Sequence, residues 1–477
     1  IGTSACKTTV MDENEKILYE STVEYTYDEP QSGYREIEPG TWTDAIDQEL
    51  SNVFGSFDPD TFAVIGVTGQ MHTTVFIDKQ GNSIRPAIMW NDIRTASLVQ
   101  PLKERCAKID ETKYIAQILS TGSPFVNTLW LKKNEPEHFA RIHQILTPYD
   151  YIVFYLTGKT SCDYCDASTS SMYDIVSKKW SQVMLDQLEL DASCLPEIHA
   201  SCQTVGELKP VLCQKFGVNR SIQVIAGTGD NPATAVAMGV INQSSPVISL
   251  GTSGVVILPK EDGDFDGKGK NVLFSTDNRK IFNIVQGTVQ SAGGTHLWWI
   301  RKIMETNQMD LDQDRIRTED LGNNEVLFYP HITGEKTLYA DASLRGAFFG
   351  LGQGTVRKDM TQAVFEGVAF GFRQLLENMN VKVWPTHIQI NGGGTRSEIW
   401  MHIIANVLHA DIEVVRLKAT PGVGACMLAK MADGKPLKPA LASSGQVIHP
   451  SLTIMEKYDQ QYKKYKKIHS LLKQLDA

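Results

Sequence analysis

The chain has 477 residues, a formal net charge of −9 at pH 7, 42% hydrophobic residues and 21% charged residues. Its length predicts two large domains rather than one core, and its composition is typical of a water-soluble globular protein. The negative charge argues against nucleic acid as a partner, and no apolar run approaches the length of a membrane span.

The first predicted element is a strand over residues 5–10, which follows the turn Ile1-Gly2-Thr3-Ser4 and precedes a charged turn at residues 12–14. A Gly-Thr-Ser turn offers backbone N–H groups and hydroxyls without a bulky side chain, and such donors can bind phosphate. An ordinary hairpin turn is the competing interpretation. Lys7, taken alone, is a solvated residue of the strand.

Residues 61–68 (TFAVIGVT) predict a buried strand that ends at Gly69-Gln70-Met71-His72. Ligands collect where strands end in open α/β sheets, so His72 is a binding candidate. A histidine satisfied inside the core is the alternative. Residues 84–91 (IRPAIMWN) predict a second strand end, where Trp90 would form a pocket wall and Asp92 follows closely.

Residues 97–160 are predicted to be mainly helical and structural. Gly158-Lys159-Thr160 resembles the end of a P-loop, but the glycine required five positions before Gly158 is Val153. Residues 151–156 also predict a helix that Gly158 ends, so we reject the P-loop. The polar, small-residue stretch 163–173 (DYCDASTSSMY) assigns no role to any one residue.

The eight cysteines are spread thinly, and Cys162-x-x-Cys165 is their one close pair. No second pair completes a zinc site, so we expect reduced thiols in a cytoplasmic protein. Structural zinc is the alternative.

Residues 222–239 (IQVIAGTGDNPATAVAMG) predict a short buried strand, a glycine turn and a helix. Pro232 suits the first helical turn, which places Asp230 or Asn231 at the N-cap. Asp230 then either caps the helix, worth about 1 kcal/mol, or serves as a functional acid in a narrow mouth walled by glycines.

The polar segment at residues 241–246 (INQSSP) predicts a hinge between domains over residues 1–242 and 243–477. Directly after it, residues 247–258 (VISLGTSGVVIL) surround a second Gly-Thr-Ser turn, at Gly251 and Thr252. One such turn is a weak signal. Two of them, each beginning one half of the chain, favour phosphate binding and a functional Asp230.

The second half is predicted to hold a charged surface loop at residues 261–270 and an amphipathic, core-facing helix over residues 361–379. Gly293 and Gly294 precede another helix. Between a strand at residues 388–390 and a helix from Glu398 lies Asn391-Gly392-Gly393-Gly394-Thr395-Arg396-Ser397. Three glycines there let a flat ligand or a phosphate lie on bare backbone, and tight packing of strand on helix is the competing interpretation.

Residues 421–425 (PGVGA) begin another predicted helix, which is expected to border the same ligand pocket as the three-glycine loop. The chain ends in a Lys-rich helical stretch (YKKYKKIHSLLKQL), which we interpret as a solvated face.

The two turns, Gly229-Asp230-Asn231, Gly69-Gln70-Met71-His72 and Trp90-Asn91-Asp92 resemble the FGGY carbohydrate kinases, and within that family the xylulokinases. The resemblance runs from Ile1 to about Ala429. It implies an α/β fold of the two-domain actin-like, sugar kinase and Hsp70 ATPase type (ribonuclease H-like), with a cleft between the domains. ATP and Mg²⁺ would bind in that cleft.

The resemblance also implies residue roles, with Asp230 as the general base. The substrate residues would be Gln70, Met71, His72, Trp90, Asp92 and Asn231. The residues that bind the nucleotide would be Thr3, Ser4, Lys7, Gly251, Thr252, Gly293, Gly393, Gly394 and Ser397. In the family an acidic residue just before the position of Ile1 helps to hold the metal, so we expect it to precede this sequence and assign no metal ligand within it.

The expected function is ATP-dependent phosphorylation of a sugar, with D-xylulose as the first choice. A kinase for gluconate, ribulose or another polyol is the alternative. A regulator that binds sugar without phosphorylating it would not need the Asp230 base, and Met71-His72 argues against an Hsp70-like or actin-like ATPase. The expected partners are a small-molecule sugar and ATP, without nucleic acid or membrane, and a homodimer is left open.

Overall fold

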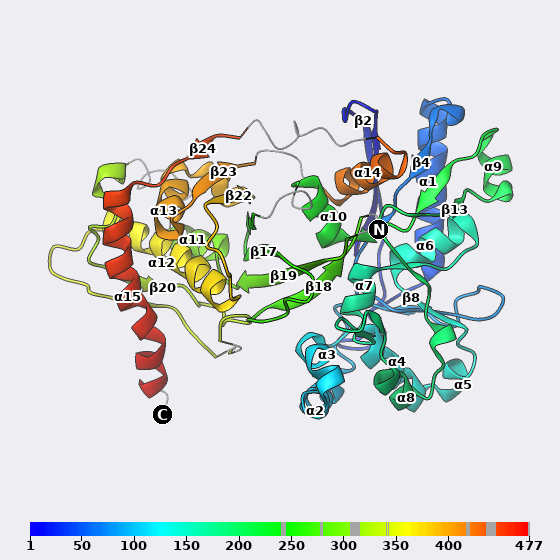
Figure 1. The fold of residues 1–477 in the computed structure, drawn as a ribbon, viewed down its shortest axis with the longest axis horizontal. Coiled ribbons are helices and arrows are strands. Elements are labelled where there is room, and N and C mark those ends of the chain that lie inside the picture. The colour runs from blue at the N-terminus through cyan, green and yellow to red at the C-terminus, as the bar shows by residue number, and fades with distance from the viewer. Residues whose placement is uncertain are drawn as a thin grey trace.

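The computed structural model describes residues 1–239, 245–276, 280–305, 315–339, 341, 343–415, 420–435 and 445–475. They form two lobes side by side (Figure 1), the first half of the chain in one lobe and most of the second half in the other. Mixed helices and strands in two lobes agree with the predicted α/β class. Of the predicted hinge, residues 241–244 lie outside the described residues.

The first lobe is built from short strands that pair in small groups. An antiparallel hairpin, a three-stranded sheet and a parallel pair matter most for the site, and further two-stranded pairs surround them. The hairpin is β1 (Ala5–Met11) with β2 (Ile17–Glu24), the sheet is β13 (Thr204–Glu207), β14 (Gln223–Ile225) and β4 (Val64–Ile65), and the parallel pair is β5 (Thr68–Gly69) with β15 (Thr228–Gly229). The smaller pairs are β3 (Glu36–Ile37) with β7 (Ala87–Ile88), β6 (Val75–Ile77) with β8 (Gln144–Leu146), β9 (Cys162–Asp163) with β12 (Ile198–His199), and β10 (Tyr173–Asp174) with β11 (Lys179–Trp180).

The expected single strand over residues 61–68 is wrong, because the segment forms β4 and β5 with a break between them. The break faces Gly227, whose φ of 76° interrupts the neighbouring chain between β14 and β15. A Cβ atom on Gly227 would lie 2.0 Å from the Val67 carbonyl oxygen, so the two backbones touch where the ladder is interrupted.

Helices cover the first lobe, and α6 ends at Gly158 in the left-handed conformation, as predicted. The expected helices between residues 97 and 160 are confirmed, although β8 interrupts them. The helices are α1 (Pro39–Ser56), α2 (Ala96–Cys106), α3 (Lys113–Ile118), α4 (Pro124–Asn134), α5 (Pro136–Phe139), α6 (Pro148–Thr157), α7 (Tyr164–Thr169), α8 (Gln182–Leu188), α9 (Pro210–Phe216) and α10 (Asp230–Ala237).

The second lobe contains a seven-stranded sheet on which two helices pack. The sheet order is β18 (Lys270–Phe274), β19 (Phe282–Val289), β17 (Gly254–Lys260), β16 (Val247–Leu250), β22 (His387–Asn391), β23 (Asp411–Val414) and β24 (Val447–Ile448). The helices are α12 (Arg357–Asn378), which confirms the predicted amphipathic helix, and α13 (Glu398–Leu408). Around them lie α11 (Gly293–Trp298), the hairpin of β20 (Leu327–Tyr329) and β21 (Ala347–Phe349), and α15 (Leu452–Leu475).

The C-terminal helix α15 is only partly the solvated helix that we expected. Its lysines at residues 463, 464, 466 and 467 are exposed. Tyr458, Tyr462 and Tyr465 lie on the other face and are buried in the core of the second lobe. The spacing of these tyrosines at three and four residues forms one helical stripe, which the lysine content of the sequence conceals.

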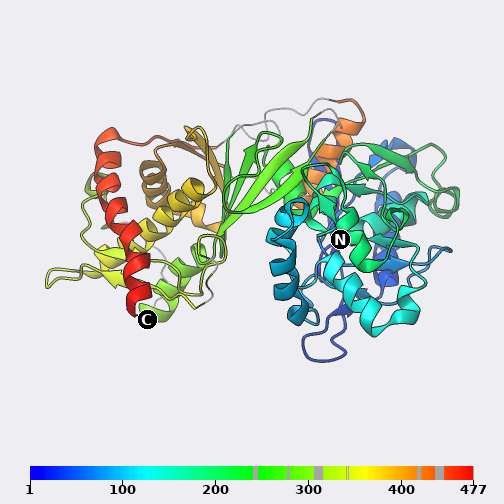
Figure 2. The same ribbon diagram turned by 60° about the horizontal axis from the view of Figure 1, so that its bottom comes forward.

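Two elements of the second half of the chain cross to the first lobe. Helix α14 (Pro421–Ala432), orange in Figures 1 and 2, lies against α10 and β1 of the first lobe. A Cβ atom on Gly424 of α14 would lie 1.8 Å from the Ala233 carbonyl oxygen of α10, so these helices touch backbone to backbone. A shared core that includes Val236 and Val423 therefore joins the two halves.

The hairpin of β18 and β19 is the second crossing, and it reaches across to α7 (Figure 2). The Leu273 N–H donates to the Ser168 hydroxyl at 3.0 Å, and the Ser201 N–H donates to the Ser275 carbonyl at 2.8 Å. These hydrogen bonds tie an edge strand of the second lobe to the first lobe. Among the described residues, none of the helices is long and apolar enough to span a membrane.

Candidate active site

The first-lobe residues predicted to bind the sugar follow the ends of two strands that run parallel and side by side. In the pairing of β5 with β15, Thr68 lies opposite Thr228 and Gly69 opposite Gly229. Gln70 and Asp230 therefore leave their strands at the same edge. On the other side of β5, the Ile1 amino group donates to the Thr68 carbonyl at 2.6 Å, and the Gln70 N–H donates to the Ile1 carbonyl at 2.8 Å. The first Gly-Thr-Ser turn thus begins at this edge as well.

Asp230 is the first residue of α10, and Gly229 is the N-cap, so the expectation of a cap at Asp230 or Asn231 is wrong. Gly229 is both the last residue of β15 and the N-cap of α10, so the helix follows the strand directly and begins one residue earlier than expected. The Asp230 carboxylate accepts the Asn231 N–H at 2.7 Å. Burial raises the pKa of the Asp230 carboxyl, and the Asn231 hydrogen bond opposes that shift. A raised pKa makes a carboxylate a stronger base.

Met71 lies against the residue that precedes Asp230, and His72 follows Met71 in the chain. A Cβ atom on Gly229 would lie 2.5 Å from the Met71 Cγ, so the Met71 side chain rests on the residue before Asp230. His72 adopts the left-handed conformation with φ of 69°. Burial, and to a smaller extent the nearby charge of Lys270, lowers the pKa of His72 to about 3. The imidazole is therefore neutral near pH 7, and its buried Nδ1 has no partner among the described residues.

Trp90 is linked to the first turn through its side chain. Its indole N–H donates to the Thr3 hydroxyl at 3.1 Å, and that hydroxyl lies 3.4 Å from the Gln70 Oε1. The Gln70 amide nitrogen is buried without a partner among the described residues. The structure thus brings together Thr3, predicted for the nucleotide, and Trp90 and Gln70, predicted for the sugar.

Asp92 does not share this environment. Its carboxylate is fully buried and forms an ion pair with Arg94 at 2.7 Å. It also accepts the Arg35 N–H at 2.6 Å. These two contacts involve Oδ2, and Oδ1 accepts the Arg94 backbone N–H at 2.8 Å. Both oxygens are thus engaged by the protein, and the structure places Asp92 as an anchor of the segment that carries Trp90. Contact between Asp92 and the sugar stays a prediction.

On the second lobe, the turn at Gly251 and Thr252 joins β16 to β17, as predicted, and the start of α11 packs against it. The Gly293 N–H donates to the Gly251 carbonyl at 2.9 Å, and the Gly294 N–H donates to the Thr252 carbonyl at 2.8 Å. A Cβ atom on Gly293 would lie 2.4 Å from the Gly251 oxygen. Gly293 is therefore needed for packing and lies behind the turn.

In the three-glycine loop after β22, one glycine is packed tightly and another faces open space. A Cβ atom on Gly394 would lie 2.5 Å from the Leu250 side chain, so Gly394 supports the interpretation of tight packing. A Cβ atom on Gly393 would have no neighbour within 4 Å, and one on Gly251 would have only the Ser253 oxygen, at 3.6 Å. Bare backbone facing open space at Gly251 and Gly393 fits a nucleotide. Ser397 is buried and uses its hydroxyl to cap α13 at the Trp400 N–H.

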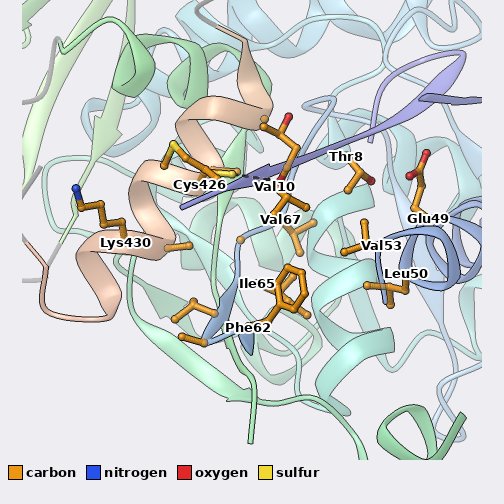
Figure 3. A pocket seen from close by; sticks show the side chains of 18 of the residues that line it. Thr8, Val10, Glu49, Leu50, Val53, Phe62, Ile65, Val67, Cys426 and Lys430 are labelled. Atoms are coloured by element: carbon orange, nitrogen blue, oxygen red, sulfur yellow. Dashed lines mark hydrogen bonds between the residues drawn. The ribbon is translucent and has the colours of Figure 1, made fainter. Parts of the chain in front are cut away.

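Ser4, Lys7, Asn231 and Thr252 are exposed. Lys7 borders a cavity of about 510 Å³ between β1, β4, α1 and α14. Figure 3 shows side chains from α1, such as Val53, and from α14, such as Cys426, on different sides of this cavity. Its walls are mostly apolar and include neither Asp230 nor Gln70, Met71 or His72, so we place the candidate active site at the strand ends instead.

Three residues that shape the site were not predicted from the sequence. Arg94 holds Asp92, and the Thr73 hydroxyl accepts the Trp90 N–H at 3.0 Å. The spacing Asp92-x-Arg94 was a visible signal for the ion pair. Lys270, at the start of β18 in the second lobe, contributes a positive charge that acts on His72. An interaction between lobes leaves no local signal in the sequence.

Comparisons with known proteins show the family of the chain and its fold. Models of the FGGY family of carbohydrate kinases match residues 1–237 (N-terminal domain) and 247–432 (C-terminal domain). The chain is 30% identical to the xylulose kinase of Staphylococcus xylosus, with 98% of both chains covered. It is similar to the solved structure of a xylulose kinase from Brucella ovis, with a TM-score of 0.86 and 27% identity over 100% of this chain and 98% of that one. A gluconate kinase structure from Lactobacillus acidophilus shares the fold, with a TM-score of 0.83 and 23% identity over 99% and 96% of the two chains.

The fold and the family models define a two-domain sugar kinase, a class in which ATP, usually with Mg²⁺, supplies the phosphoryl group. The chain belongs to the FGGY family of carbohydrate kinases, since the two family models together cover most of its length. The predicted family and fold class are confirmed, and so is the prediction of a carbohydrate kinase.

Proposed function

We propose that the protein transfers the γ-phosphoryl group of ATP to D-xylulose and forms D-xylulose 5-phosphate. The observation that carries the proposal is the pairing of β5 with β15, because it brings Gln70 and Asp230, the residues that follow the two strands, to the same edge. The similarity to relatives named xylulose kinase over nearly the whole chain supports this choice of sugar.

In the proposed reaction, Asp230 accepts the proton of the terminal sugar hydroxyl. That oxygen then forms a bond to the γ-phosphorus of ATP, the bond from this phosphorus to the bridging oxygen breaks, and ADP leaves. The raised pKa of Asp230 matches the task, because a base works best when its pKa approaches the working pH. The protein otherwise supplies alignment and charge neutralisation.

The two turns would hold the nucleotide, with donors from Thr3 and Ser4 in the first lobe and from Gly251 and Thr252 in the second. The open backbone at Gly393 would border the adenosine. Mg²⁺, when bound, would neutralise phosphate charge. Mg²⁺ is usually held by one or two carboxylates, water and the phosphates, and its protein ligand in this chain stays unassigned.

A sugar acid such as gluconate is a second candidate, and one observation favours it. The Lys270 side chain is exposed, its charge acts on His72, and it has no hydrogen-bond or ion-pair partner within the described ranges. Desolvation by the surrounding protein, and then repulsion from Lys336 and Lys103, lowers the pKa of Lys270. A carboxylate on the substrate would relieve that repulsion.

A cytoplasmic location and a homodimer stay predictions from the sequence.

A screen of ADP release against D-xylulose, D-ribulose, polyols and D-gluconate tests the proposal. We expect D-xylulose to give the highest kcat/KM. Strong turnover of D-gluconate with none of D-xylulose would select the second candidate. The Asp230→Asn variant should bind sugar and ATP but lose about 10²-fold to 10⁴-fold in kcat, and turnover at the wild-type rate would remove Asp230 as the base.

A further inference from the structure

Thr3 lies in the first turn, but its side chain contacts Trp90 and Gln70, which are predicted to bind the sugar. The Trp90 indole N–H donates to its hydroxyl oxygen at 3.1 Å. The hydroxyl proton can reach the Gln70 Oε1 at 3.4 Å, which is a long distance for an O–H donor. The Thr3 hydroxyl oxygen thus accepts a normal hydrogen bond from Trp90, whereas the Thr3 hydroxyl proton is donated to Gln70 only weakly.

Trp90 is held firmly at its backbone, and its side chain makes one hydrogen bond within the described part of the chain. Its backbone N–H donates to the Thr73 hydroxyl at 3.0 Å, and a Cβ atom on Gly122 would lie 2.3 Å from its carbonyl oxygen. The side chain is 46% exposed. The hydrogen bond to Thr3 is therefore the polar contact that fixes the orientation of the indole.

We propose that the Thr3 hydroxyl couples the binding of nucleotide and sugar by fixing Trp90. A phosphate oxygen is an acceptor, so it can take the weakly held proton of Thr3 while the oxygen of Thr3 keeps the Trp90 N–H. Thr3 is then bonded on both sides, and each hydrogen bond polarises the next. Either ligand orders the Thr3–Trp90 pair, and the other ligand meets a site that is already ordered. Thr3 is a positioning residue in this scheme, which rests on the proposed kinase function.

Calorimetry of D-xylulose binding, with and without Mg²⁺ and a non-hydrolysable ATP analogue, tests the coupling. The ratio of the two sugar dissociation constants is the coupling factor. For the wild type we expect the analogue to tighten sugar binding by about 5-fold to 30-fold. Thr3→Val keeps the shape of the side chain without the hydroxyl, and its factor should fall below about 2. Thr3→Ser keeps the hydroxyl and should keep the factor.

Ser4→Ala is the matched control, because Ser4 lies in the same turn and is exposed. It should weaken binding of the analogue but leave the coupling factor unchanged. Full coupling in Thr3→Val, or a loss as large in Thr3→Ser or Ser4→Ala as in Thr3→Val, would overturn the inference. Trp90→Phe keeps a ring without the N–H, and it should lower the factor as Thr3→Val does.

The two proposals fail in different ways. Phosphorylation of D-xylulose by the wild type with equal coupling in wild type and Thr3→Val overturns the role of Thr3 alone. If the wild type phosphorylates another sugar instead, the choice of D-xylulose is wrong, and the same variants are measured with that sugar. If it phosphorylates no sugar in the panel, both proposals fail.

Discussion

The side chain of Met71 rests on Gly229, the residue immediately before Asp230. A Cβ atom on Gly229 would lie 2.5 Å from the Met71 Cγ and 2.9 Å from its Sδ. Methionine is flexible, so Gly229→Ala should fold with Met71 displaced. We expect the KM for the sugar to rise about tenfold, because small displacements near a reacting group are costly. The KM for ATP serves as the internal control, and an unchanged sugar KM would contradict the contact.

The pH dependence of kcat/KM should follow Asp230 and not His72. The pKa of Asp230 is raised by burial, so activity should rise as pH passes upward through that value and then level. The pKa of His72 is about 3, so this imidazole should add no inflection between pH 5 and 8. Asparagine tolerates the positive φ at this position, so His72→Asn tests the assignment. A wild-type inflection near pH 6.5 that His72→Asn abolishes would show that His72 titrates.

Glu366 should make the protein less stable as pH rises. This buried carboxyl accepts hydrogen bonds from Gln362, Tyr458 and Asn324, and burial raises its pKa to about 7. Between about pH 4.5 and 7 the unfolded chain releases the proton while the folded protein keeps it, so stability falls by up to about 3 kcal/mol. Urea midpoints at pH 5 and pH 8 should differ less in Glu366→Gln than in the wild type. Equal pH dependence in both proteins would argue against a protonated Glu366.

Gly424→Ala tests the contact between α14 and α10. The added methyl group would lie 1.8 Å from the Ala233 carbonyl oxygen, so the helices must separate. We expect a loss of about 1 to 3 kcal/mol in unfolding free energy. Gly55→Ala is the matched control, since Gly55 lies in α1 with nothing within 4 Å of its Cβ position. That change should stabilise the protein by up to about 1 kcal/mol. Similar results for the two variants would contradict the packing.

Lys270→Met separates the two candidate substrates. If D-xylulose is the substrate, the loss of this cation should change kcat/KM less than about threefold, as is typical of a charge that makes no direct pair. If a sugar acid is the substrate, loss of the cation that would bond its carboxylate should raise its KM by about tenfold or more. Steady-state kinetics with both compounds decides between these results. Lys268→Met, which removes another cation close in sequence, is the control.

The sequence predicted the elements whose signals are local. The strand, glycine turn and helix around Asp230, the helix α12 and the end of α6 at Gly158 all follow from periodicity, glycine and proline. The N-cap of α10 was misplaced by one residue, because a glycine that ends a strand can also begin a helix.

Contacts between distant segments could not be predicted in the same way. The packing of α14 on the first lobe and the hydrogen bond between β18 and α7 depend on tertiary contacts. The predicted nucleotide glycines looked alike in sequence, but Gly393 faces open space while Gly394 packs against Leu250. Only the neighbours of each position distinguish the two.

The hydrogen bonds that tie β18 and the chain after it to the first lobe restrict how the kinase can open. On that side, Leu273 with Ser168 and Ser201 with Ser275 hold the lobes together. Pulling the lobes straight apart would break these bonds, whereas a swing with its axis beside β18 would preserve them. The lobes would then open by a hinge motion, and sugar entry and product release would take place on the side away from β18.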